Sequence, residues 1–143
     1  MNLSEAIRAA LIGETAITSR LATYAEAPAV FTRRPAPSEA DYPLIMVSPD
    51  ITITDEDGVN DQRPVIIRDI AVYGRNDTAA RYRNVEVVGY AIRDLFHRQR
   101  HVIDAPDDWN VIDVRAQGPR PAPVDDDTTV GRLVELTVRL SRR

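Results

Sequence analysis

Apolar residues recur at two different spacings along this chain, and each spacing predicts a different element. From residue 3 to residue 11 they recur every three or four positions, which is typical of a helix with one buried face. Gly13 interrupts this pattern, and a helical pattern resumes from 14 to 21. We therefore expect a broken helix at the start of the chain, followed by an exit loop over 24–28.

A second, longer helix has the clearest pattern in the sequence. Either Asn76 or Asp77 can cap its start, and the pattern continues to about His97. Arginines and acids cover one side, so the helix should lie along a sheet with its other side buried. The predicted buried stripe comprises Tyr82, Val85, Val88, Gly89, Ile92, Leu95 and Phe96.

Strand-like segments make up most of the remaining chain. Apolar residues fall on both faces of 65–73, so we expect this strand near the centre of a sheet or against a neighbouring subunit. Pro49 precedes 51–54 and predicts a bent or edge strand there. Within 109–116, Ile112 and Val114 are expected in the core. The predicted strands are 29–33, 44–47 with its bent continuation 51–54, 65–73, 109–116 and 130–140.

The order and length of these elements predict one domain spanning residues 1–143. We expect an α+β fold: a two-layer sandwich with a mixed, mainly antiparallel sheet of about four or five strands. The N-terminal helix and the long helix should both pack on this sheet. Two polar segments should be exposed loops, the acidic stretch 55–63 and the Pro- and Asp-rich stretch 117–128.

Composition narrows the classes of function. The chain has no cysteine, which excludes disulfides, thiol nucleophiles and cysteine-ligated metals. Its apolar runs are far shorter than the ~20 residues that span a bilayer, so no membrane partner is expected. The net charge of -4 disfavours a protein whose main task is to grip phosphate backbones. All 18 basic residues are arginine, which suits protein interfaces better than lysine does.

Candidate chemistry is sparse, and we expect no catalytic residue, no metal and no cofactor. His97 and His101 have a spacing that could face one metal, but no third ligand lies at a fixed spacing, so we interpret them as part of a cationic last helical turn. The acidic stretch at 55–58 lacks the later ligands of a calcium loop. Carboxylates brought together only by folding could still do acid–base chemistry.

Several segments, in order, are similar to one family. The helix carrying Ala9-Ala10-Leu11 is followed by Val30-Phe31, then by 43–47, and then by 69–75, which leads straight into the long helix. An acidic loop and the strand 132–139 close the pattern. Together they resemble the tail-completion, or tail-terminator, family of long-tailed phages and gene transfer agents. Gly74 departs from a serine that is common in the family, and 118–123 is an elaboration of this chain.

The resemblance implies a structural virion protein at the tail–neck junction, made in the cytoplasm of a bacterial host. Such subunits form a ring, typically a hexamer, on the head-proximal end of the tail tube. The ring stops polymerisation of the tube protein and joins the tail to a neck or stopper protein. DNA would pass through its lumen without sequence-specific binding.

Contacts in a ring would come from the two polar loops, although each of these residues could equally be only solvated. From the loops, the candidates are Asp55, Glu56, Asp57 and Asp61, together with Asp125, Asp126 and Asp127. Their candidate charge partners are Arg63, Arg68, Arg115 and Arg120.

Three other readings stay open at this point. The chain could be a neck or head–tail connector subunit, which is also small, ring-forming and non-catalytic. It could be a small carboxylate-based enzyme. It could also be an adaptor that binds a partner by strand addition at a sheet edge.

Overall fold

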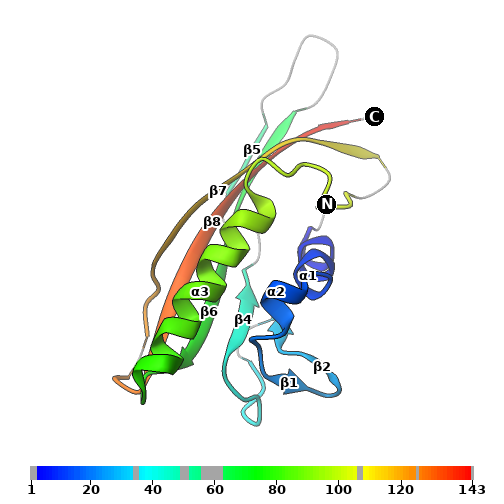
Figure 1. The fold of residues 1–143 in the computed structure, drawn as a ribbon. Coiled ribbons are helices and arrows are strands. Elements are labelled where there is room, and N and C mark those ends of the chain that lie inside the picture. Colours follow the sequence, from blue (N-terminus) through cyan, green and yellow to red (C-terminus); the bar gives the residue numbers. More distant parts are fainter. Residues whose placement is uncertain are drawn as a thin grey trace.

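The computed structural model is a sheet with helices packed on one face (Figure 1). It describes residues 3–33, 36–48, 52–55, 63–105, 108–124 and 126–142, with only the backbone described for 52–55. The helices are α1 (Ser4–Ile12), α2 (Thr15–Thr18) and α3 (Ala79–Phe96). The strands are β1 (Thr23–Tyr24), β2 (Ala27–Pro28), β3 (Val30–Phe31), β4 (Leu44–Val47), β5 (Thr52–Asp55), β6 (Pro64–Arg75), β7 (Trp109–Pro121) and β8 (Thr129–Arg142).

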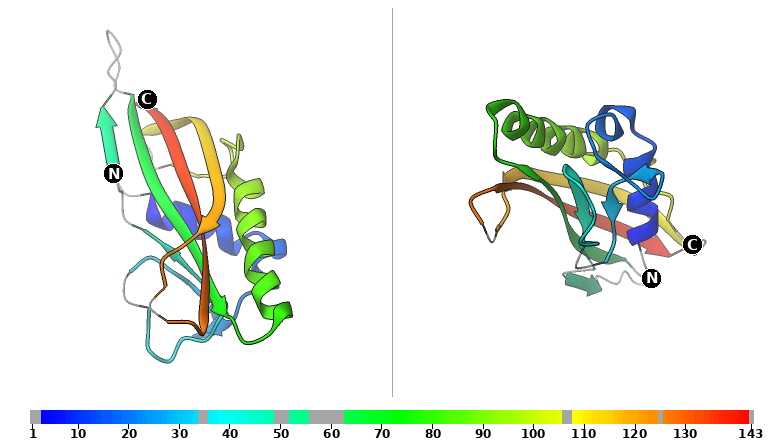
Figure 2. Two further views of the ribbon diagram at one scale, coloured as in Figure 1. Left: turned by 90° about the vertical axis from the view of Figure 1, so that its left-hand side faces the viewer. Right: turned by 90° about the horizontal axis from the view of Figure 1, so that it is seen from below.

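The main sheet has the order β3-β4-β6-β8-β7, and β5 pairs with β6 on the same edge as β4. β3 and β4 are parallel, and the other described pairs are antiparallel. Figure 2 shows the helices gathered on one side of this sheet. The predicted two-layer α+β fold with a mixed, mainly antiparallel sheet is confirmed.

β6 is the strand around which the sheet is arranged, because three strands pair along its two edges. On one edge, β5 pairs with residues 64–67 and β4 with residues 70–73. On the other edge, β8 pairs with every residue from 65 to 75. Ile66 and Ile70 are buried on the helix side, and Ala71 is buried on the other side. The predicted central position of this strand is confirmed.

The main core lies between the sheet and the helices. Side chains from α1, α3 and the helix-facing positions of β6, β7 and β8 meet there, and full burial of each large apolar side chain contributes about 1.5–3 kcal/mol. The fully buried members include Ile7, Leu11, Ile66, Ile70, Ile92, Phe96, Leu136 and Leu140. Within the predicted stripe of α3, Tyr82 and Leu95 are only partly buried, and the remaining members are buried.

The opposite face of the sheet is partly covered by the chain itself. Leu44, Met46 and Tyr73 project from β4 and β6 on that side and pack against Tyr42 and other residues of the preceding segment. Farther along β6 and β8 the face carries half-buried residues such as Ile67, which lies opposite Thr137. In the described part of the chain, no helix covers this open part of the sheet (Figure 2).

The first helical segment is broken as predicted. α1 ends at Gly13, and α2 restarts with Glu14 as its cap, whose carboxylate accepts a hydrogen bond from the Ala16 amide. The cap of α3 differs from the prediction. The hydroxyl of Thr78, and neither Asn76 nor Asp77, accepts the hydrogen bond from the Arg81 amide.

Residues 24–28 contain strand residues where an exit loop is expected. Tyr24 pairs with Ala27, so Ala25 and Glu26 form a two-residue turn. Both turn residues have positive φ, 49° and 66°. Turns of this kind favour Asn and Gly, and Ala-Glu gives no such signal in the sequence.

β7 is longer than the sequence predicts. The stretch 117–128 is expected to be a loop, whereas β7 pairs with β8 as far as Pro121. Its register shifts between Gln117 and Arg120, and the strand accommodates its prolines because proline is tolerated at bulges. Gly118, with φ of 113°, supplies a backbone conformation that other residues rarely adopt. Only residues 122–128 connect the two strands.

The prediction that Ile112 lies in the core is wrong, because a second register shift occurs at this residue. The shift lies between Val111 and Asp113, so Ile112 is the extra residue on β7 and its side chain is 42% exposed. Val114 is fully buried, as predicted. Alternation read from the sequence fails here because a bulge moves the phase by one residue.

Gly74 lies where α3 crosses β6, and its lack of a side chain is required there. A Cβ atom at this position would lie 2.3 Å from Cγ2 of Val85, which is itself fully buried. The close approach of helix and strand therefore favours glycine at this position.

We predict that Gly74→Ser lowers the free energy of unfolding by about 1–3 kcal/mol, since the added atoms force the helix away from the strand. Val85→Ala should offset part of this loss in the double variant, as measured by urea denaturation. Gly13→Ala is the control, because its Cβ would make only ordinary contact, at 3.4 Å from the Ala9 carbonyl oxygen. Wild-type stability of Gly74→Ser would contradict this packing.

Candidate assembly surfaces

The described borders of the two polar segments predicted to make contacts lie at opposite ends of the sheet. Asp55 pairs with Pro64 at one end of β6, and Arg75 pairs with Thr129 at the other end. A strand of this length spans roughly 40 Å at about 3.3 Å per residue. In Figure 1 the orange connection between β7 and β8 lies at the lower end, where β6 ends and α3 begins. The subunit thus has two distinct polar ends.

At the first end, the structure describes only the borders of the acidic segment. Asp55 is the last residue of β5, and Arg63 is exposed immediately before β6. The candidates Glu56, Asp57 and Asp61 lie outside the described residues.

At the second end, Asp126 shapes the short connection between β7 and β8. Its Oδ1 accepts hydrogen bonds from the Thr128 amide at 3.0 Å and the Thr128 hydroxyl at 2.9 Å. Hydrogen bonds from the Thr128 and Thr129 side chains hold the pKa of Asp126 below its ordinary value of 3.8. Asp127 is exposed, and Asp125 lies outside the described residues.

Arg115 and Arg120 lie on the open face of the sheet and already have partners within the subunit. Nε of Arg115 is 3.2 Å from the Asp113 carboxylate, and Nη2 of Arg120 is 3.6 Å from the Glu135 carboxylate. Both arginine side chains remain more than half exposed, so these pairs contribute little to stability. Their guanidinium groups stay accessible to a second molecule.

The position of Arg68 does not fit the expectation that it pairs with surface loops. Its side chain points toward the helices and is only 2% exposed. Nη1 donates a hydrogen bond to the Ser4 hydroxyl at 2.7 Å, which joins β6 to α1. Arg68 lies within a strand that the sequence predicts to be apolar on both faces. The sequence pattern does not show that its side chain faces the helices.

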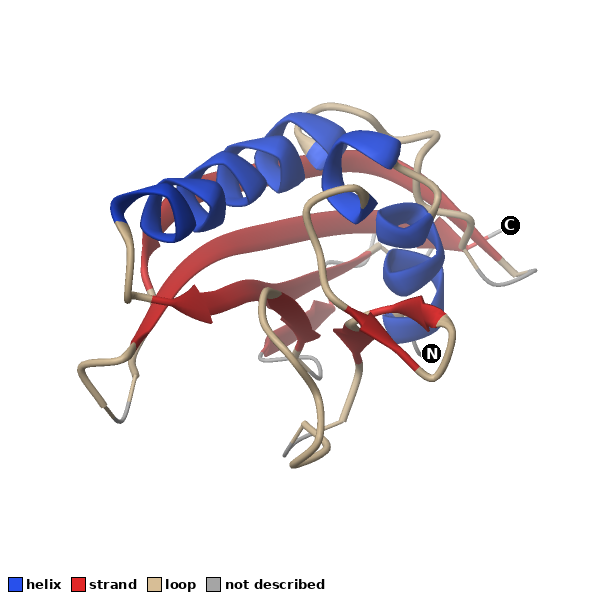
Figure 3. Ribbon diagram, turned by 60° about the horizontal axis from the view of Figure 1, so that its bottom comes forward, coloured by secondary structure: helices blue, strands red, loops and turns tan. Residues whose placement is uncertain are grey.

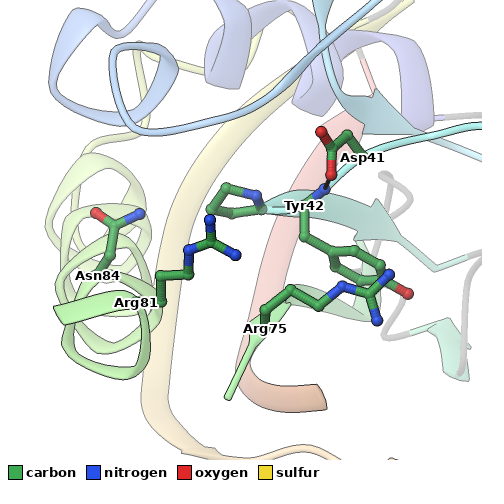
Figure 4. Close-up of a pocket in the computed structure, with 6 residues that line it drawn as sticks. Asp41, Tyr42, Arg75, Arg81 and Asn84 are labelled. Atoms are coloured by element: carbon green, nitrogen blue, oxygen red, sulfur yellow. Dashed lines mark hydrogen bonds between the residues drawn. The ribbon is translucent and has the colours of Figure 1, made fainter. Parts of the chain in front are cut away.

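A pocket of about 290 Å³ lies at the second end of the molecule, between the first turns of α3 and the segment that leads into β4 (Figure 4). It is open to solvent and mostly polar. The residues that line it come from three parts of the chain: Asp41, Tyr42, Pro43, Arg75, Arg81 and Asn84.

Neighbouring groups orient the polar side chains of this pocket. The Arg75 guanidinium carbon lies 4.3 Å from the centre of the Tyr42 ring, a cation–π arrangement. Nη1 of Arg81 is 2.9 Å from the Asp77 carboxylate. The side-chain amide of Asn84 is oriented by Arg20, whose Nη1 donates a hydrogen bond to the Asn84 Oδ1 at 3.0 Å. The pocket therefore presents the guanidinium groups of Arg75 and Arg81 beside an amide whose oxygen and nitrogen both hydrogen-bond to Arg20.

This pocket was not predicted from the sequence, although the positions of two of its residues could have indicated it. Arg75 ends a strand and Arg81 lies in the first turn of the helix that follows. A strand and a helix joined by a short turn must bring these two side chains to the same end of the molecule. The contribution of Tyr42 comes from a distant segment, which only the fold brings near.

The edge of the sheet at β7 is covered where α3 ends. The Arg98 amide donates a hydrogen bond to the Val114 carbonyl oxygen at 2.8 Å, and Arg98 has a positive φ of 59°. Nδ1 of His97 accepts a hydrogen bond from the Ala116 amide at 3.1 Å. Two residues after the helix thus occupy backbone groups that an edge strand otherwise exposes.

This arrangement also gives a structural role to the first of the two histidines. α3 ends at Phe96, so His97 and His101 are not two positions on one helix face. Within the described part of the chain, no group of three or more His, Cys, Asp or Glu side chains is placed to hold a metal ion. Among the described helices, none is long and apolar enough to cross a membrane.

Two large apolar side chains stand on the outer face of α3. Val87 is 43% exposed and Tyr90 is 55% exposed, and they are neighbours three positions apart on the helix. These two side chains belong to the helix layer, and the open face of the sheet is on the opposite side of the subunit.

The fold belongs to the class of two-layer α+β domains. A comparison with solved structures finds a similar fold in another protein. The chain is similar to a chain in the virion of a native gene transfer agent (GTA) particle, with a TM-score of 0.77. The match covers 98% of this chain and 95% of that chain at 14% sequence identity. The two chains therefore share one fold over nearly their whole length. No protein-family model matches the sequence, and no curated protein matches it either.

We predict that His97→Ala lowers the free energy of unfolding by about 1–3 kcal/mol, because it leaves the buried Ala116 amide without its acceptor. Urea denaturation followed by circular dichroism measures the change. His101→Ala, at an exposed position, is the matched control and should have no measurable effect. Equal stability of the two variants would rule out this role for His97.

The connection between β7 and β8 should respond to acid. Because the folded-state pKa of Asp126 is lowered, its stabilising contribution is complete above 3.8 and is lost as the pH falls through the lowered pKa. An NMR titration of the Asp126 carboxyl should give a midpoint below 3.8 in the wild type. Thr128→Val removes a hydroxyl donor and should raise that midpoint, whereas an unchanged midpoint would contradict the hydrogen-bonding cause.

Proposed function

We propose that this chain is a structural virion protein that forms a ring and acts as a tail terminator. In this role it caps the head-proximal end of the tail tube, stops polymerisation of the tube protein and joins the tail to the neck. The observation that carries the proposal is the fold shared, over 98% of this chain and 95% of the other, with a chain of a GTA virion. The ordered sequence resemblance to the tail-terminator family supports the same role.

The two polar ends of the subunit suit a component placed between two partners. If the long strands run roughly along the tail axis, the end of the sheet at Asp55 and Pro64 faces one side of the ring, and the end at Arg75 and Thr129 faces the other. One end would then contact the tube protein and the other the neck or stopper protein. These contacts would use charged side chains at the two ends, such as Arg63, which is exposed in the subunit.

A ring also needs two different lateral surfaces, because each subunit contacts one neighbour with one patch and the next neighbour with another. The outer face of α3, with Val87 and Tyr90, supplies one such patch. The open face of the sheet, with half-buried Ile67 and exposed Arg115, supplies the other. The number of subunits that we propose, six, rests on the family resemblance.

The charge of the chain fits a ring through which DNA passes. A net charge of -4 does not favour adhesion to the phosphate backbone. The lumen would therefore let the genome move without sequence-specific binding.

The proposal predicts that the purified chain binds one end of assembled tail tubes from the same particle. Electron microscopy of tube protein polymerised with increasing amounts of this chain should show shorter tubes, each with added density at one end. Tyr90→Arg is expected to weaken ring formation and restore long tubes, while Ala80→Arg, on an exposed first-turn position, is the matched control.

Two results would count against this role. Binding to DNA-filled heads without any effect on tube length would favour a neck or head–tail connector subunit. Tubes of unchanged length and bare ends, at every ratio of the two proteins, would contradict the tail-terminator function.

A further inference from the structure

We propose that the pocket between β4, β6 and α3 receives the Asp127 carboxylate of a second copy of this chain. This inference rests on the ring proposed above and identifies one of its lateral contacts. The pocket and the acidic connection are two separate features of the subunit. Their chemistry and their positions make them complementary.

The pocket has the chemistry of a carboxylate site. Arg75 and Arg81 line it directly, and Arg20 is hydrogen-bonded to its Asn84. Against these three guanidinium groups stand two carboxylates, Asp41 and Asp77. The local charge is therefore positive on a chain whose net charge is -4. Guanidinium groups bind carboxylates through paired, charge-assisted hydrogen bonds.

Arg75 is the member of the pocket with the most bonding capacity left. Its guanidinium stacks on the Tyr42 ring, and in the part of the chain that the structure describes it takes part in no ion pair. Stacking holds the group in place but uses none of its N–H donors. Arg81 adds a second guanidinium with a side chain that is 62% exposed.

The acidic connection has the matching features. Asp126 is committed to the Thr128 amide and hydroxyl, and it fixes the turn. Asp127 follows it, is exposed, and has no partner within the described residues. In Figure 3 this connection extends beyond both layers, on the side away from β1 and β2.

The connection of the same subunit does not fill its own pocket. The Asn76 amide donates a hydrogen bond to the Thr128 carbonyl oxygen at 2.8 Å and ties the end of the connection to the turn after β6. Rotation about a ring axis keeps the same end of every subunit on the same side. A connection that projects from one subunit can therefore reach a pocket at the same end of the next.

The absence of cysteine from this chain allows a direct test by disulfide cross-linking. One variant carries Asp127→Cys and a second carries Asp41→Cys, which lines the pocket and leaves both arginines intact. A disulfide forms only if the two Cα atoms approach within about 7 Å. Mixing the two variants under mild oxidation, with and without tail tube protein, should give a covalent dimer on a non-reducing gel.

Arg83→Cys is the matched control for the pocket variant. It lies on α3 two residues after Arg81, is exposed, and does not line the pocket. Asp127→Cys mixed with Arg83→Cys should give no more dimer than either variant alone. Equal cross-linking of the two mixtures, or none in either, would overturn the proposed contact.

Charge exchange provides a second, independent measurement. Arg81→Glu or Asp127→Arg alone should raise the protein concentration needed for assembly by about tenfold, and the double variant should recover most of the loss. Arg83→Glu is the control, and analytical ultracentrifugation is the readout. Single variants that assemble like the wild type would contradict the inference. If the single variants instead lose binding to tube protein or DNA while self-assembly stays intact, the pocket serves that other partner and the inference is wrong.

The outcomes separate this inference from the function on which it rests. If the chain caps tubes but shows no specific cross-link, the terminator role is supported and the proposed contact is contradicted. A specific cross-link without any effect on tubes would keep the contact between copies and remove the terminator role.

Discussion

The pairing of β6 with β8 is the interaction on which the rest of this structure depends. It continues without a break over residues 65–75, and the helix-facing side chains of both strands are buried along most of that length. β4, β5 and β7 are added to the outer edges of this pair, and α3 lies across it. Because the pair is long, it separates two polar ends of the subunit. Every surface that could take part in assembly is positioned by this pair.

Packing between helix and sheet determines how the second end is built. Gly74 lets α3 start close to the end of β6, and Arg132 on β8 donates hydrogen bonds to Tyr82 and Glu86 of the same helix. The side chain of Arg132 is only 14% exposed, whereas that of its partner Glu86 is 41% exposed, so this link runs from beneath the helix to its surface. The helix start is thereby held against the sheet from two strands. The pocket nearby owes its shape to this fixed junction.

The sequence predicted the parts of the fold whose periodicity is long and regular. α3, β6 and β8 follow from their spacing of apolar residues, and so does the class of fold. The extent of β7 does not, because Gly118 and the bulge that ends at Arg120 are read as a loop by any rule based on local propensity. The pocket was missed for another reason: Tyr42 and Arg75 are far apart in sequence, and neither stands in a recognisable motif. Isolated charged residues in a sequence can be recognised as parts of one site only when the fold brings them together.

The backbone cap on β7 has a consequence for how subunits can join. Proteins whose outermost strands are bare can merge their sheets edge to edge, and such growth has no natural end. Here the residues that follow α3 occupy the backbone groups of Val114 and Ala116 that a foreign strand would need. At this part of the β7 edge, a neighbour must therefore contact side chains, whose shapes define an angle between subunits. A defined angle lets an assembly close on itself after a finite number of copies, whereas sheet merging would extend it indefinitely.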